Sequence, residues 1–130
     1  MPSLPRPARA TVFALLCILA LTGCRTNEKG TRPDAAFTPY ITAFTAGHIS
    51  ARSPIIVRIA EGQTWKDSSA AAIQSLFALS PQVKGMVEWH DELTLAFVPA
   101  ERLEQDRTYQ VEFALGRLIE VPKGLEAFRF

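Results

Sequence analysis

The densest group of side chains able to bind a metal ion or move a proton is His90-Asp91-Glu92. An imidazole and two carboxylates are ligands that zinc or calcium accepts in proteins. Consecutive residues of an extended chain point in alternating directions, however, so these three do not converge on one ion. They also lie between two runs of alternating apolar residues, where a polar hairpin turn is typical. We therefore expect a hairpin here, and neither a metal nor a cofactor.

The other reactive side chains favour a protein without catalytic residues. His48 has Ser50 and Ser53 nearby in sequence but no adjacent carboxylate, and it follows Gly47 as a turn residue would. The chain has two histidines and lacks the Gly-x-Ser-x-Gly pattern of a nucleophile elbow. Catalysis needs a nucleophile, base or metal in a positioned set. A glycosidase-like carboxylate pair stays open on spacing, but nothing in the sequence favours it.

The N-terminal segment has the order of a secretory signal peptide. Arg6 and Arg9 precede an uncharged, apolar run over residues 11–21, and small residues follow it. This run of 11 residues is about half of the roughly 20 that a helix needs to span a bilayer. We therefore predict that residues 1–23 are a signal peptide and not a membrane anchor.

Leu21-Thr22-Gly23-Cys24 resembles the bacterial lipobox. The resemblance implies that a signal peptidase cuts before Cys24, whose sulfur carries diacylglycerol and whose new amino group usually carries a further acyl chain. Buried methylene groups contribute about 0.8 kcal/mol each, so two or three chains hold a protein at a membrane. In lipoproteins of this kind, aspartate directly after the lipidated cysteine commonly marks retention in the inner membrane. This chain has Arg25 there, which favours the outer membrane of the bacterial envelope. Whether the domain faces the periplasm or the cell surface stays open. The alternative is a soluble secreted chain with an accidental cysteine.

Cleavage after Gly23 removes 23 of the 130 residues and leaves 107, which suffices for one small domain. Arg6 and Arg9 leave with the signal peptide, so 12 basic residues face 13 acidic ones and nucleic acid is not an expected partner. Cys17 is removed as well, and the sulfur of Cys24 is committed to a thioether. No disulfide can then form, and the domain must be stabilised by its apolar core.

The mature chain divides into a tether and a domain. Residues 24–38 are polar, mixed in charge and without periodicity, so we predict a lipidated cysteine and a flexible tether. Residues 39–130 show short alternating runs between turn residues, which predict an all-β sandwich of six or seven strands. The residues expected to share one face in each run are Tyr40, Thr42 and Phe44; Ile55, Val57 and Ile59; Val83, Gly85, Val87 and Trp89; Leu93, Leu95 and Phe97; Tyr109, Val111, Phe113 and Leu115; and Phe128 with Phe130.

One segment has helical spacing instead. Within 67–77, a serine or aspartate can cap the start, and Ile73, Leu76 and Phe77 recur at i, i+3 and i+4. We expect a short crossover helix between the sheets. Of the two tryptophans, Trp89 shares the predicted inward face of its run and is expected in the core. Trp65 lies among polar residues, and two interpretations stay open: an exposed contact for a partner, or packing beneath the crossover.

Three stretches resemble the Ig-like modules of bacterial surface proteins. Ser53–Glu61 resembles their second strand, Thr94–Pro99 resembles an apolar-polar-apolar strand that ends in proline, and Leu103–Val111 resembles the entry to the next strand. The resemblance implies that Tyr109 bonds its hydroxyl back to the preceding loop and fixes a corner. The modules often carry Pro-Gly before this tyrosine, whereas this chain has Gln105-Asp106.

Together with the lipobox and tether, most of residues 39–130 is similar to the N-terminal domain of bacterial alpha-2-macroglobulin-like lipoproteins. Those long chains begin with a lipid anchor followed by β-sandwich domains. The family's Cys-x-Glu-Gln thioester is absent, since Cys24 is followed by Arg-Thr-Asn. The resemblance implies that the chain is either a first domain separated from a longer protein or an incomplete gene product, and that it cannot trap a protease covalently by itself. The further stretches that carry it are Ile41–Ser50, Leu79–Gly85 and Leu118–Lys123.

The leading hypothesis is a non-catalytic, membrane-anchored Ig-like domain that serves as spacer and docking module of a protease-inhibitor lipoprotein. Its partners would be membrane lipid, through acylated Cys24, and downstream domains or other envelope proteins. The alternative is a stand-alone envelope lipoprotein that binds carbohydrate or protein, with Trp65 as a contact residue. An enzyme ranks third.

Overall fold

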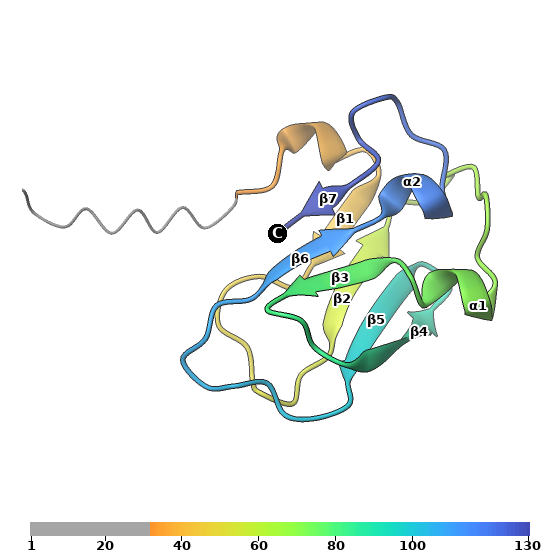
Figure 1. The fold of residues 1–130 in the computed structure, drawn as a ribbon. Coiled ribbons are helices and arrows are strands. Elements are labelled where there is room, and N and C mark those ends of the chain that lie inside the picture. The colour runs from red at the N-terminus through yellow and green to blue at the C-terminus, as the bar shows by residue number, and fades with distance from the viewer. Residues whose placement is uncertain (1–31) are drawn as a thin grey trace, which may run out of the picture.

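The computed structural model describes residues 32–130, and the predicted signal peptide and Cys24 lie outside this range. The described chain forms two antiparallel sheets packed face to face, with short helices at one end (Figure 1). One sheet has the order β1 (Ile41–Phe44), β2 (Ile55–Ile59), β5 (Thr94–Pro99) and β4 (Gly85–Asp91). The other has the order β3 (Phe77–Ser80), β6 (Gln110–Phe113) and β7 (Phe128–Arg129). The short helices are η1 (Ala35–Phe37), α1 (Ala70–Ile73) and α2 (Leu115–Leu118).

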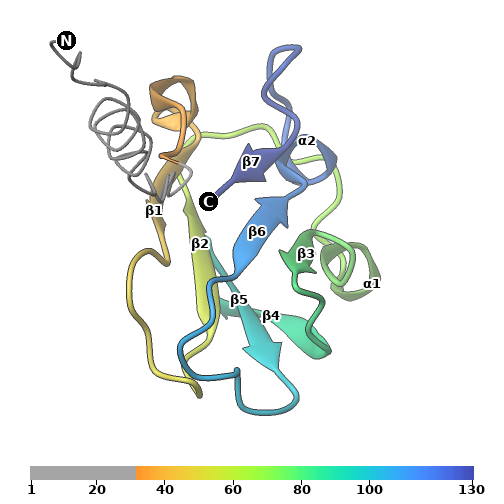
Figure 2. The ribbon, with the colours of Figure 1, turned by 60° about the vertical axis from the view of Figure 1, so that its left-hand side comes forward.

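This strand order identifies the kind of sandwich. The first, second, fifth and fourth strands form one sheet, and the third, sixth and seventh form the other. That is the four-plus-three arrangement of constant-type immunoglobulin domains. Figure 2 shows the two sheets crossing with β1 and β7 on the same side of the molecule. The prediction of an Ig-like, all-β sandwich is therefore confirmed.

The core is built from the inward faces of both sheets. On β2, Ile55, Val57 and Ile59 are at most 2% exposed, while the residues between them face outward, as the alternation predicted. Phe113 on β6 is fully buried and meets Phe77 edge to face, with ring centroids 4.9 Å apart. Burial of each such side chain contributes about 1.5–3 kcal/mol, and no cysteine lies between residues 25 and 130 to add a covalent link.

The first strand departs from the predicted face. Its register shifts between Ile41 and Ala43, so that Thr42 is the extra residue of a β-bulge. The bulge places Ile41 in the core, leaves Thr42 exposed, and lets Phe44 pack against the core. The prediction that Thr42 shares one face with Tyr40 and Phe44 was wrong, because a bulge breaks the period of two.

The predicted helix over 67–77 is shorter than expected. Ser69 caps it by accepting a hydrogen bond from the amide of Ala72, but α1 ends at Ile73. Phe77 instead begins β3 and pairs with Phe113 on β6. Pairing with an available strand outweighed the weak helical spacing of the last apolar residues, and β3 was missed.

Two further boundaries differ from the predictions. The run that includes Leu115 ends as a strand at Phe113, and Leu115 is buried as the first residue of α2. At the other end, residues 35–37, predicted within the tether, form η1, and its N-cap Asp34 accepts a hydrogen bond from the amide of Ala36. Phe37 is 8% exposed and meets Phe128 edge to face, so the folded domain includes it.

Candidate functional site

Two tryptophans, one exposed and one half-buried, meet at the surface of the domain. The rings of Trp65 and Trp89 meet edge to face, with centroids 5.7 Å apart and planes at 73°. Trp65 is 38% exposed, whereas Trp89 is half-buried, packs against the core and points its indole Nε1 at the Ser68 carbonyl 3.4 Å away. The Trp65 ring therefore packs on Trp89 and also presents surface to solvent.

Hydrogen bonds on both sides of Trp65 hold its backbone in place. The amide of Glu120 donates to the Thr64 carbonyl, and the amide of Lys66 donates to the Leu118 carbonyl, both at 2.9 Å. Trp65 and Ile119 thereby form an isolated antiparallel bridge. The ammonium of Lys66 also donates to the Gly116 carbonyl at 2.8 Å. Trp65 is thus a rigid aromatic side chain rather than part of a loose loop.

The Trp65 segment lies at the end of the sandwich where the chain enters. Its neighbour Gln63 donates from Nε2 to the Pro39 carbonyl at 3.1 Å, directly before β1. The segment connects β2 with α1, and it pairs with the connection between β6 and β7, residues 114–127. Figures 1 and 2 show these connections and η1 together at the upper end of the molecule. In antibody variable domains, the corresponding connections carry antigen-contacting loops.

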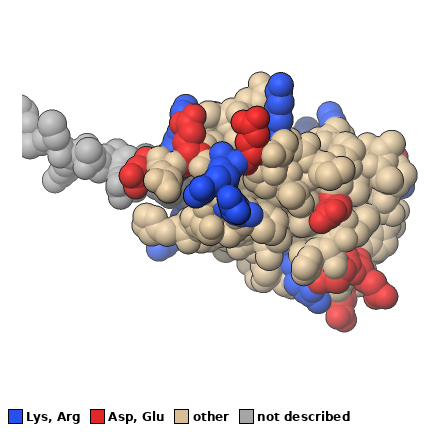
Figure 3. Space-filling model, turned by 90° about the horizontal axis from the view of Figure 1, so that it is seen from below, with Lys and Arg blue, Asp and Glu red and all other residues tan. Residues whose placement is uncertain are grey.

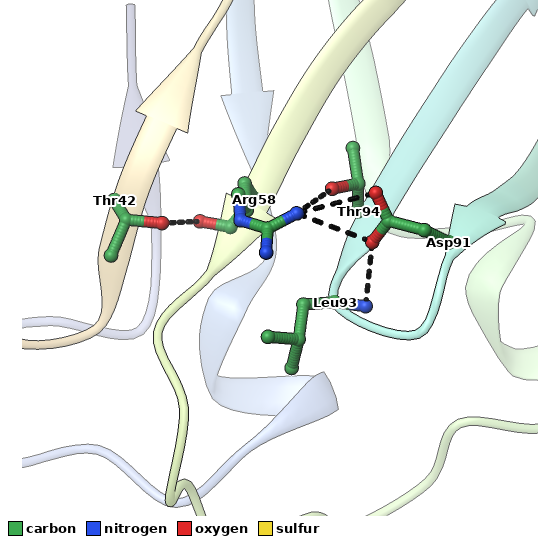
Figure 4. Close-up of polar contacts among 5 residues, drawn as sticks. All are labelled: Thr42, Arg58, Asp91, Leu93 and Thr94. Carbon is green, nitrogen blue, oxygen red and sulfur yellow. Dashed lines mark hydrogen bonds and ion pairs between the residues drawn. The ribbon is translucent and has the colours of Figure 1, made fainter.

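A second cluster of polar side chains ties together the outer face of the four-stranded sheet (Figure 4). From β2, Arg58 reaches Asp91 with an Nη1–Oδ2 distance of 3.2 Å and donates to the Thr94 hydroxyl at 3.1 Å. Asp91 Oδ1 accepts the Leu93 amide at 2.9 Å, and the Thr42 hydroxyl lies 3.5 Å from the Arg58 carbonyl. Arg58 and Asp91 are both more than 40% exposed, so this pair contributes little free energy in water.

The environment of Asp91 changes its acidity. The backbone N–H of Leu93, the hydroxyl of Thr94 and the charge of Arg58 favour the carboxylate and lower the pKa of Asp91 below its usual value. His90 and Glu92 point into solvent on either side of it. The predicted hairpin is confirmed, because Asp91 pairs with Thr94 across the turn. Within residues 32–130 we find no three His, Cys, Asp or Glu side chains grouped to hold a metal ion.

The corner implied for Tyr109 is present. Its hydroxyl accepts a hydrogen bond from the amide of Glu104 at 3.0 Å, directly before β6 begins. Asp106 adopts φ 54°, a left-handed conformation that glycine adopts without strain and aspartate tolerates better than most residues. The Gln105-Asp106 pair therefore makes the turn without the glycine of the resembling modules.

An amide side chain caps the exposed edge of β4, a feature that the sequence pattern did not indicate. Gln74, just after α1, donates from Nε2 to the Val87 carbonyl at 2.6 Å and accepts the Val87 amide at Oε1 at 2.9 Å. The side chain thus copies the two hydrogen bonds of a neighbouring strand. Open strand edges invite pairing with other chains, and this cap closes the middle of β4.

Hollows in the described surface are shallow. One of about 190 Å³ lies between η1, β1 and β7, with Phe37, Phe44 and Phe128 among its lining residues. Another, of about 410 Å³, lies beside Arg52 and Arg102 at the opposite end. The first is smaller than the 300–1,000 Å³ typical of small-molecule sites, and neither contains Trp65, Trp89, His48 or His90. The second hollow falls within this range, but its lining residues, Arg52 and Pro99–Arg102, include none of the candidate residues identified from the sequence.

Comparisons with known proteins leave the family open. No protein-family model matches the sequence, and no curated protein matches it.

Among residues 32–130, no helix has the length and hydropathy needed to cross a bilayer. Figure 3 shows basic and acidic side chains in small mixed groups on the end of the molecule seen from below.

Proposed function

We propose that the chain is a lipid-anchored, non-catalytic Ig-like module of a bacterial envelope protein, and that it acts as a spacer and docking domain. The observation that carries this proposal is an immunoglobulin-type strand order that begins shortly after Cys24, the last residue of a segment that resembles a lipobox. A sandwich of this kind keeps a fixed shape, while acyl chains on Cys24 would keep it at the membrane.

The place where the chain enters the domain supports the spacer role. Phe37 is buried against Phe128, and the amide of Ala60 donates to the Tyr40 carbonyl at 2.8 Å. The entry is thus fixed to both sheets, since Phe128 belongs to β7 and Ala60 directly follows β2. Because the chain entry is fixed to both sheets, a partner bound to the domain would be held at a defined position relative to residue 37.

The protein to which the module belongs is proposed from the resemblance. We propose the N-terminal domain of an alpha-2-macroglobulin-like lipoprotein, whose protease-trapping thioester would lie in other domains. The Tyr109 corner supports an Ig-like module, and β7 runs antiparallel to β6, away from the end where the chain enters. Further domains would then lie farther from the membrane than this one.

Lipid labelling tests the anchor. We expect cells that express the whole chain to incorporate labelled palmitate into it, and Cys24→Ala to abolish labelling and leave an unprocessed precursor. Cys17→Ala is the matched control, because that cysteine lies within the apolar run, and its labelling should equal that of the wild type. Undiminished labelling of the Cys24→Ala variant would refute the anchor.

The size of the native product tests the larger assignment. An immunoblot with antibodies against residues 39–130 should detect a band many times larger than this chain in the cells that produce it. A band at the size of the processed chain would exclude the macroglobulin-like protein. It would support instead the stand-alone envelope lipoprotein with a binding surface of its own.

A further inference from the structure

We infer that the surface around Trp65 docks on the phospholipid bilayer that holds the lipid anchor, with the indole ring at the headgroup boundary. The Trp65 surface consists of Trp65, the part of Trp89 that it leaves uncovered, and the bridged backbone of residues 64–66. The inference rests on the proposed acylation of Cys24, and it names a second contact with the same membrane.

The length of chain between the anchor and the domain supports the bilayer as the partner of the Trp65 surface. Arg32 is eight residues along the chain from Cys24, so their Cα atoms lie at most about 29 Å apart even when the chain is fully extended. The chain enters the domain through η1, and Gln63 binds the Pro39 carbonyl immediately after it. Trp65 lies two residues from this contact. The end of the sandwich that carries Trp65 is therefore the end kept close to the headgroups.

The chemistry of the exposed side chains points the same way. The large apolar residues exposed in the described chain are Ile49, Trp65 and Met86. Ile49 lies in the β1–β2 connection at the opposite end, and Met86 lies on the outer face of the four-stranded sheet. Tryptophan is the side chain most typical of the membrane interface, where its ring meets both apolar and hydrated surroundings. Of these three residues, only Trp65 is an aromatic side chain at the end of the sandwich where the chain enters.

Aromatic burial, rather than charge, would drive the contact. The ammonium of Lys66 is already bound to the Gly116 carbonyl, and the neighbouring Asp67 carries the opposite charge. Its carboxylate accepts the Ser69 amide, which lowers the pKa of Asp67 and keeps it ionised. Docking should therefore change little with salt concentration or with the fraction of anionic lipid, unlike the binding of a basic patch.

Tryptophan quenching by lipid tests the inference directly, because Trp65 and Trp89 are the two tryptophans of the chain. The acylated full chain is reconstituted into phosphatidylcholine vesicles with or without a lipid that carries a quencher near its headgroup. Trp89→Phe leaves Trp65 as the reporter, and Trp65→Phe is the matched variant that leaves Trp89. We expect quencher lipid to reduce Trp65 emission at least twofold, and Trp89 emission by a clearly smaller factor.

Flotation of the vesicles separates the possible failures. A Trp89→Phe protein that floats with the vesicles but keeps its full emission overturns the inference. A protein or a sugar would then be the ligand to test at Trp65. A wild-type chain that does not float overturns the proposed anchor instead. Thermal melting confirms that each variant is folded. If Trp89→Phe does not fold, the fraction of emission quenched in the wild type is compared with that in Trp65→Phe in the same vesicles, and equal fractions overturn the inference.

Discussion

Asp91 accepts hydrogen bonds from Arg58 on β2 and from the Leu93 amide of its own turn, although its side chain is nearly half exposed. Its lowered pKa means that the folded state binds a proton at Asp91 less readily than the unfolded chain does. The resulting stabilisation is complete above the pKa of the unfolded chain. It is lost as the pH falls through the lower pKa of the folded state.

Replacement of Asp91 by asparagine should remove this acid-sensitive part of the stability. The amide oxygen still accepts the Leu93 amide, but the attraction to Arg58 is lost. We expect the wild type to melt at a higher temperature than Asp91→Asn above about pH 5, and the difference to shrink below the usual carboxyl pKa of about 4. Melting curves across this range measure it. Glu92→Gln, in the same turn, is the control and should show no such trend.

Removal of the Tyr109 hydroxyl should lower the free energy of unfolding modestly, because this oxygen accepts the hydrogen bond that fixes the corner. Tyr109→Phe leaves the Glu104 amide without its acceptor, so we expect the free energy of unfolding to fall by about 0.5–1.5 kcal/mol. Urea denaturation measures this change. Tyr40→Phe is the matched control, because no hydrogen bond involves the Tyr40 hydroxyl in the described structure. Equal effects of the two substitutions would show that the corner contributes nothing specific.

Single residues were predictable where a local rule applies. The Tyr109 hydrogen bond was implied by the resemblance to Ig-like modules, and the buried face of β2 follows from alternation. The contact between Trp65 and Trp89 does not, since the two lie on different elements and meet only after folding. Gln74 is of the same kind, because no sequence rule pairs a side-chain amide with a strand 13 residues away.

At the scale of elements, β4 depends on Gln74 for the closure of its edge. Gln74→Ala removes one acceptor and one donor from Val87, and water can replace them only in part. We expect a loss of about 1–3 kcal/mol of unfolding free energy and faster amide exchange at Val87. Urea denaturation and hydrogen exchange measure these effects.

Gln82→Ala serves as the control for Gln74, because Gln82 is exposed in the connection between β3 and β4. It should leave both the stability and the exchange at Val87 unchanged. Unchanged exchange in Gln74→Ala would show that the amide does not protect the strand. Increased aggregation of the same variant would be the expected consequence of an open strand edge.

The elements that the sequence misassigned share one cause. Phe77 fits both a helical spacing and a strand, and its partner Phe113 decided for the strand. The bulge at Thr42 and the turn of η1 likewise depend on what they pack against, not on local propensity. Alternating runs alone therefore located six of the seven strands, while several of their ends depended on tertiary contacts.

At the scale of the whole molecule, the core carries the stability of the described domain without covalent help. Phe113 is fully buried between both sheets and contacts Phe77. We expect Phe113→Ala to cost about 3–5 kcal/mol, a large part of the 5–15 kcal/mol typical of a domain, and to lower the urea midpoint accordingly. Met86→Ala, at an exposed site, should change the midpoint little. A small effect of Phe113→Ala would contradict a core centred on this ring.

The fold of the molecule was more predictable than its surface function. Period-two patterns recur along the chain, so the sandwich emerges even when individual boundaries are wrong. The proposed docking surface combines Trp65 and Trp89 from distant segments, and the backbone bridge from Trp65 to the buried Ile119 holds Trp65 in place. Nothing in their spacing distinguishes such a surface from a patch of the core.

The burial of Phe37 also determines how the domain would respond to tension. A pull on the chain before Asp34 meets the Phe37 ring, seated against Phe128, before it reaches the first hydrogen bond between β1 and β2. Because Phe128 lies in the other sheet, the force is shared by both layers from the start and does not peel β1 away bond by bond. In single-molecule pulling from Cys24, Phe37→Ala should therefore yield at lower force than the wild type.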